Sequence, residues 1–173
     1  MPYLTGNNIY LRALEPEDLE ILYRWENDSS LWIHSCTLAP FSKFTLREYI
    51  QNSSYDIYQT RQLRMMIALR ENDETIGMID LFDIDPHHER GAVGILISSG
   101  YQKKGLGKEA LQLMSEYAFD FLHLHQLYAH ILQENKASLK IFTACGFIPC
   151  GLLYEWQKTD KGYENVVIMQ RIN

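Results

Sequence analysis

Residues 91 to 147 constrain the fold more than any other part of the chain. An apolar run at residues 95–97 is followed by a turn with two glycines at residues 102–107, and an amphipathic segment then continues to about residue 122. This order predicts a strand that leads through a turn into the start of a helix. The first N–H groups of such a helix have no partner within it, and the helix dipole adds partial positive charge there. The segment therefore predicts a site for an anion such as a pyrophosphate.

The size and composition of the chain exclude several classes of protein. Its 173 residues suffice for one domain with a substantial core, so we expect a single domain over residues 1–173. No apolar run approaches the roughly 20 residues of a membrane helix, and the N-terminal residues do not resemble a secretory signal. The net charge of −6 argues against nucleic acid as a main partner. Cys36, Cys145 and Cys150 form neither a disulfide framework nor a zinc spacing, which favours a cytoplasmic protein without a metal.

Hydrophobic periodicity predicts a mixed α/β arrangement without repeats or linkers. Strands are expected at residues 9–14, 65–69, 75–83, 90–98, 126–132, 152–158 and 163–171. Helices are expected after Pro16, from a capping box at Thr45 to about residue 58, at residues 106–122 and at residues 138–144.

Three phosphate-binding motifs compete for the glycine-rich turn. Gly100 and Gly105 have the spacing of a P-loop, but Leu106 stands where that motif requires lysine. Residues 105–110 match a dinucleotide fingerprint with Ala110 as the third small residue. That fingerprint also needs a carboxylate about 20 positions later, and residues 127–130 contain none. An NAD-type dinucleotide-binding protein therefore remains only as an alternative.

The third motif is Gln-x-x-Gly-x-Gly at residues 102–107. It occurs together with Leu-Arg-Ala-Leu-Glu at residues 11–15, Asp-Leu at 18–19, Glu-Asn at 134–135 and Gly-Phe at 146–147. With this combination, nearly the whole chain resembles the GNAT superfamily of acetyl-CoA-dependent N-acetyltransferases. The resemblance is greatest to the branch of spermidine and ribosomal-protein alanine N-acetyltransferases. It implies a mixed α/β fold with a central, mostly antiparallel sheet of about seven strands and about four flanking helices. The strands of this sheet would splay apart at the acetyl-CoA site.

The resemblance also implies an activity and partners. An acetyl group would move from acetyl-CoA to a primary amine by direct attack, and a homodimer is expected. The acceptor could be a polyamine such as spermidine, a protein N-terminal amine or another small amine. Backbone amides of the turn would hold the pyrophosphate, the apolar strand would pair with the pantetheine, and the last short helix would line its far side. The implied coenzyme contacts are Ile95, Leu96, Ile97, Gln102, Lys103, Lys104, Gly105, Leu106, Gly107, Lys108, Asn135, Ser138 and Phe142.

Two positions depart from the usual catalytic pattern of the family. Many relatives carry a tyrosine acid where this chain has Phe142, and a glutamate where it has Ala92. Phenylalanine and alanine transfer no protons, so an active enzyme would need other side chains for this role. The alternative function is an acyl-CoA-binding sensor domain with weak or lost catalysis. We expect Asp83, near the end of a strand, and Glu155, in the last hairpin, to take this catalytic role.

The acceptor pocket is expected at residues 25 to 44, where such enzymes shape it. Glu26, Asp28 and Trp32 could hold a cationic amine through charge and cation–π contact. The spermidine branch has paired acids where this chain has Leu38 and Ala39, which argues against polyamine regulation.

Overall fold

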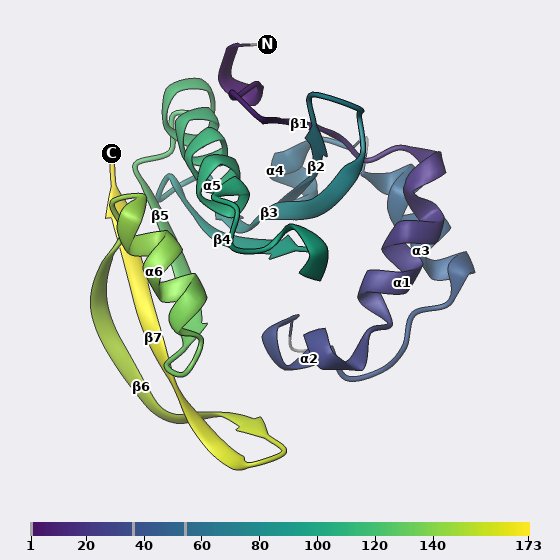
Figure 1. Ribbon diagram of the computed structural model, residues 1–173. Coiled ribbons are helices and arrows are strands. Elements are labelled where there is room, and N and C mark those ends of the chain that lie inside the picture. Colours follow the sequence, from purple (N-terminus) through teal and green to yellow (C-terminus); the bar gives the residue numbers. More distant parts are fainter. Residues whose placement is uncertain (1, 36, 54) are drawn as a thin grey trace.

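A seven-stranded sheet runs through the protein in the order β1-β2-β3-β4-β5-β7-β6 (Figure 1). The computed structural model describes residues 2–35, 37–53 and 55–173. Neighbouring strands are antiparallel except for β4 and β5, which are parallel. The predicted mixed and mostly antiparallel sheet is therefore confirmed. The strands are β1 (Ile9–Ala13), β2 (Gln62–Leu69), β3 (Thr75–Asp85), β4 (Arg90–Ile97), β5 (Gln126–Leu132), β6 (Ile148–Thr159) and β7 (Gly162–Ile172).

Six α-helices occur in the described residues, against about four expected from the sequence. The additional short helices begin at local side-chain caps, such as Asp56, which accepts from the N–H of Tyr58. The predicted capping box at Thr45 was wrong, because Ser42 caps the helix by accepting from the N–H of Thr45. The helices are α1 (Leu19–Glu26), α2 (Ser29–Ser35), α3 (Lys43–Asn52), α4 (Ile57–Thr60), α5 (Leu106–Glu116) and α6 (Lys136–Ala144), and a π-helical turn at Tyr117–Phe121 follows α5.

Each face of the sheet has its own core. On one face, α5 buries Leu111 and Met114 against alternate strand residues such as Ile79. On the other face, a smaller cluster joins Leu22 of α1 to Met78 of β3, and α3 adds further apolar side chains. Figure 1 shows α1, α2 and α3 together on one side of the molecule, with α5 and α6 on the other. The middle of the sheet, at β4 and β5, thus lies between these two helical layers.

The parallel pair β4 and β5 separates along its length. Pairing is limited to residues 90–92 of β4 and 126–128 of β5. Beyond Ala92, β4 stays paired with β3 as far as Ile97, and β5 stays paired with β7 as far as Leu132. The two strands therefore part toward their carboxyl ends, which confirms the predicted splay. Within the ranges that the structure describes, no helix combines the length and the hydropathy needed to cross a membrane.

Candidate active site

Helix α5 begins without a side-chain cap at the splayed end of β4. Its N-cap residue is Gly105, and no side chain accepts a hydrogen bond there. The first N–H to bond back is that of Glu109, which donates to the carbonyl of Gly105 over 3.1 Å. The N–H groups of Leu106, Gly107 and Lys108 thus have no acceptor within the helix. Together with the helix dipole they form an anion site in the predicted place.

The two glycines of this turn differ in backbone conformation and in surroundings. Gly105 has φ +82°, a left-handed conformation, and a Cβ added there would meet nothing within 4 Å. Gly107 is buried, and its added Cβ would lie 3.4 Å from side-chain carbons of both Ile97 and Ile141. These are ordinary van der Waals distances, so packing against β4 and α6 does not by itself require glycine at 107.

The side chain of Gln102 joins the turn to the end of the strand. Its Nε2 donates to the carbonyl of Ile97 over 2.9 Å. Lys103, Lys104 and Lys108 are exposed around the helix start, and the ammonium of Lys104 lies 4.8 Å from the centroid of the Tyr101 ring. These lysines add positive charge near the anion site without filling it.

The apolar run of β4 divides its side chains between the two cores. Ile95 and Ile97 pack on the α5 side, and Leu96 packs on the side of α1 and α3. The backbone edge of this run faces the gap left by β5 and has no strand partner there. An extended chain of amides can pair with such an edge.

Helix α6 packs beside α5, and its first turn is fixed by a side chain. Asn135 accepts a hydrogen bond at Oδ1 from the N–H of Ser138 over 3.1 Å. Both residues expected to contact pantetheine therefore also build the helix start. Phe142 is only 2% exposed and packs edge-on against Phe147, with ring centroids 4.9 Å apart. Its ring belongs to the core beneath α6.

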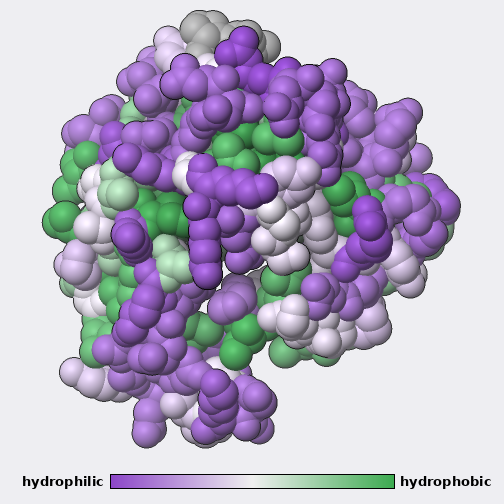
Figure 2. All heavy atoms as spheres, in the orientation of Figure 1, coloured by the Kyte–Doolittle hydropathy of each residue, from purple (hydrophilic) through white to green (hydrophobic). Residues whose placement is uncertain are grey.

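A cavity of about 310 Å³ opens between α2, β5, α6 and β7. Figure 2 shows the corresponding hollow in the surface between α2 and α6. The lining residues are Ile33, His34, Leu132, Glu134, Asn135 and Glu164.

The structure does not bring the two expected catalytic carboxylates to the splayed end of β4. The side chain of Asp83 is exposed, and its backbone is left-handed with φ 49°. It lies where the β3–β4 register shifts, just beyond the pair of Phe82 and Ala92. That position is at the paired end of β4, opposite to the end where the gap opens. Glu155 is exposed on the edge strand β6, and both β7 and β5 lie between that strand and β4.

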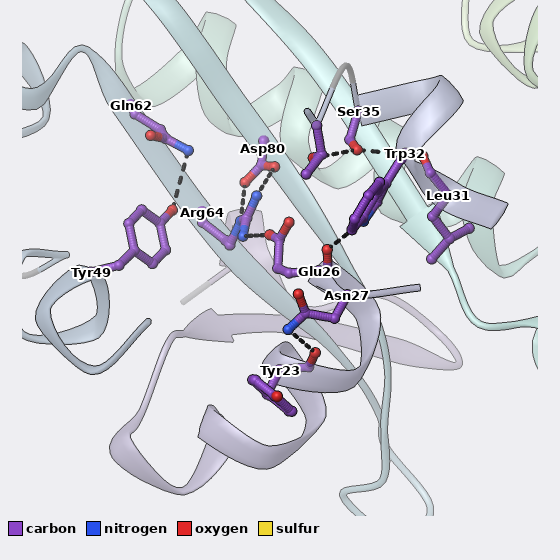
Figure 3. Close-up of polar contacts among 11 residues, drawn as sticks. Tyr23, Glu26, Asn27, Leu31, Trp32, Ser35, Tyr49, Gln62, Arg64 and Asp80 are labelled. Atoms are coloured by element: carbon purple, nitrogen blue, oxygen red, sulfur yellow. Dashed lines mark hydrogen bonds and ion pairs between the residues drawn. The ribbon is translucent and has the colours of Figure 1, made fainter. Parts of the chain in front are cut away.

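A different acid lies close to the gap. Asp80 pairs with Gly94 in the register of β3 and β4, and its carboxylate binds Arg64 of β2. Arg64 also donates to Glu26 at the end of α1 (Figure 3). Sequence reasoning missed Arg64, although a single charged residue in the apolar strand at residues 62–69 was a signal of a buried ion pair.

The electrostatics of this cluster are set by burial and by the two carboxylates. Burial disfavours a charged Arg64, but the charge and hydrogen bond of Asp80, with smaller contributions from Tyr49 and Glu26, together outweigh burial, so the pKa of Arg64 is raised and the guanidinium stays charged. Tyr49 packs with its ring centroid 5.3 Å from the Arg64 guanidinium carbon. Burial raises the pKa of Tyr49 to about 12, so this phenol is neutral at ordinary pH.

The remaining expected acceptor residues divide into two kinds. Trp32 is half-buried, and its Nε1 donates to the carbonyl of Glu26 over 2.8 Å. Asp28 is exposed and accepts from both the backbone N–H and the hydroxyl of Ser30, which lowers the pKa of Asp28. Asp28 therefore fixes the start of α2.

Across the described ranges, no group of three or more His, Cys, Asp or Glu side chains could hold a metal ion.

A mixed sheet that parts beside an uncapped helix start is the arrangement of an enzyme that holds an acyl-coenzyme A thioester between two strands. The chain belongs to the acetyltransferase (GNAT) domain family, whose model matches residues 8–148. The protein is thus an acetyltransferase that uses acetyl-CoA.

The relatives found by sequence and by structure agree with this assignment. The chain is similar to spermidine N(1)-acetyltransferase of Escherichia coli K12, with 28% identity over 168 residues that cover 95% of this chain and 86% of that protein. Its fold matches spermidine N-acetyltransferase from Vibrio cholerae in complex with CoA and spermine, with a TM-score of 0.86, 25% identity and 95% coverage of both chains. A dodecameric structure of the Vibrio cholerae enzyme matches with a TM-score of 0.79 and 27% identity, covering 95% of this chain and 93% of that one.

Proposed function

We propose that the protein transfers the acetyl group of acetyl-CoA to a primary amine by direct attack of the amine on the thioester. The observation that carries this proposal is the coincidence of two features at one end of β4. Strand β4 loses its pairing with β5 after Ala92, and α5 begins without a side-chain cap after the turn that follows Ile97. A diphosphate at the helix start directs the attached pantetheine along the free edge of the strand.

The coenzyme contacts follow from this placement. The N–H groups of Leu106, Gly107 and Lys108 bind the diphosphate, and Lys103 and Lys104 add charge around it. The strand edge at residues 95–97 pairs with the pantetheine amides, and α6 covers their far side from Asn135 onward. In this scheme Gln102 acts by holding the turn against β4 rather than by touching the coenzyme.

The acceptor enters from the opposite side, through the hollow beneath α2. Polyamines such as spermidine, protein N-terminal amines and other small primary amines are the candidate acceptors. The similarity to spermidine N-acetyltransferases supports a polyamine, and the acids Glu134 and Glu164 that line the hollow support a cationic acceptor. The dodecameric relative also supports self-association of this chain, which light scattering of the purified protein would measure.

Thiol release from acetyl-CoA with a panel of primary amines tests the proposed activity. We expect thiol release that depends on both the amine and the protein, with acetylated amine as the product by mass spectrometry. Binding of acetyl-CoA without turnover on any amine would favour the sensor alternative instead. Protection from heat by NAD, but not by CoA, would favour a dinucleotide-binding protein.

A further inference from the structure

Three charged side chains form a largely buried cluster on the acceptor side of the sheet. We call Glu26, Arg64 and Asp80 the charged triad. Arg64 donates from Nε and from a terminal nitrogen to the two oxygens of Asp80, each over 2.7 Å, and from its other terminal nitrogen to Oε1 of Glu26. The three side chains are only 12%, 11% and 19% exposed for Arg64, Glu26 and Asp80. Two carboxylates and one guanidinium leave a net charge of −1, and the neutral Tyr49 does not compensate it.

The triad lies beside an opening in the sheet surface. Residues paired directly across antiparallel strands project to the same face, so Gly94 lies next to Asp80 on that face. A Cβ at Gly94 would touch only the ring edge of Phe82, at 3.4 Å. Space therefore remains beside Asp80, two residues after Ala92, where β4 parts from β5.

Helix α2 connects the triad to the hollow. Its Trp32 donates to the backbone carbonyl of Glu26, and Figure 3 shows the indole close to the triad. Its next residues, Ile33 and His34, line the cavity. Helix α2 thus brings Trp32 beside the triad and Ile33 and His34 to the wall of the hollow, whose other lining residues include Glu134 and Glu164.

We propose, building on the acetyl transfer proposed above, that Glu26 and Asp80 bind the acceptor amine as an ammonium ion and that Arg64 positions both carboxylates. An ammonium ion brings the triad and its ligand to neutrality, which offsets the cost of an uncompensated buried charge. The triad selects a cationic aliphatic primary amine. It disfavours an α-amino acid, because a carboxylate next to the nitrogen would face the same negative charge.

The ammonium ion gives up two protons in the course of the transfer. One proton leaves before the nitrogen lone pair can attack, and the second leaves as the N–C bond forms and the C–S bond breaks. The departing thiolate takes up one proton and solvent receives the other. The triad acts before these steps, since it concentrates and orients the ammonium ion beside the strand edge.

Kinetics of a Glu26→Gln variant test this inference, with Glu20→Gln on the same helix as the matched control because Glu20 is exposed. The KM for the best cationic acceptor of the amine panel is compared with the KM for methoxyamine, which is uncharged at neutral pH. We expect Glu26→Gln to raise the first KM about tenfold or more, because the negative charge that faces the ammonium ion is lost and its hydrogen bond becomes a weaker, neutral one. The KM values for methoxyamine and acetyl-CoA should stay unchanged, and Glu20→Gln should match the wild type.

Two further variants separate positioning from structural support. Asp80→Asn should also raise the KM for the cationic acceptor selectively, and Arg64→Lys should raise it while lowering kcat, since lysine keeps the charge but loses the two-pronged geometry. Thermal unfolding identifies any variant that fails to fold. An unchanged KM in the folded Glu26→Gln and Asp80→Asn variants, or an equal rise for both amines, would overturn the inference alone. Absence of turnover by the wild type on every amine would instead remove the proposed function.

Discussion

The side-chain amide of Gln102 donates a hydrogen bond to the backbone carbonyl of Ile97 over 2.9 Å. This contact joins the last residue of β4 to the turn that leads into α5. It fixes the helix start relative to the strand edge, and these are the two parts that hold the coenzyme in our proposal. Gln102 is itself exposed, so the contact contributes more to the geometry of the turn than to global stability.

Replacement of Gln102 by alanine should therefore weaken coenzyme binding without unfolding the protein. We expect the KM for acetyl-CoA to rise several-fold, by about 1 kcal/mol of binding free energy, because one neutral hydrogen bond is lost. The KM for the amine and the melting temperature should change little. Steady-state kinetics with Gln59→Ala, an exposed glutamine of α4, as control would measure this. An unchanged KM for acetyl-CoA would mean that the turn keeps its position without Gln102.

The two glycines of the turn should respond differently to alanine. Gly105→Ala places a side chain in a left-handed conformation, which costs about 1–2 kcal/mol of folding stability. Gly107→Ala adds a methyl group at ordinary contact distance from Ile97 and Ile141, and the full propensity gain of about 1 kcal/mol applies only in a helix interior, not in the first turn. Urea unfolding should thus show a clear loss for the first variant and nearly unchanged stability for the second. The reverse order would contradict the conformations described for the helix start.

An ion pair between the partly buried Arg12 and the buried Asp18 gives a structural role to the N-terminal motif at residues 11–15 and 18–19. Arg12 donates from both terminal nitrogens to the two oxygens of Asp18, each over 2.7 Å, and Asp18 is 5% exposed. We expect Asp18→Ala to lower the free energy of unfolding by about 3–5 kcal/mol, because the guanidinium loses its buried partner. Chemical denaturation with Glu17→Ala as the exposed control measures this. A loss below about 1 kcal/mol would place the pair among weak surface contacts.

Phe142 occupies the position where many relatives carry a tyrosine acid. Its ring is buried, so Phe142→Tyr should lower stability by about 1–3 kcal/mol unless the new hydroxyl finds a partner. We expect kcat to rise, since a phenol can protonate the leaving thiolate, while the KM for acetyl-CoA stays the same. Single-turnover kinetics separate this chemical step from product release. A fall in kcat with an intact fold would show that the hydroxyl does not reach the sulfur.

The coenzyme half of the site follows from local sequence, whereas the acceptor half does not. Apolar runs, the two glycines and Asn135 predict β4, α5 and α6 because each signal lies within a few residues of the structure that it forms. The charged triad joins residues that are 38 and 16 positions apart, on a helix and two strands. Arg64 alone carries a local signal, as a charged residue within an apolar strand, whereas the local patterns around Glu26 and Asp80 do not distinguish their charges from solvated ones. The alternation of side chains along a strand also did not predict where Asp83 lies, because its left-handed backbone interrupts β3 there.

A crystal structure with CoA bound shows directly where the coenzyme lies. We predict that the diphosphate accepts hydrogen bonds from the N–H groups of Leu106, Gly107 and Lys108, with the pantetheine paired to β4 at residues 95–97. Its sulfur should lie in the gap between β4 and β5, on the side of Gly94. CoA bound elsewhere, with the start of α5 and the edge of β4 unoccupied, would contradict the account.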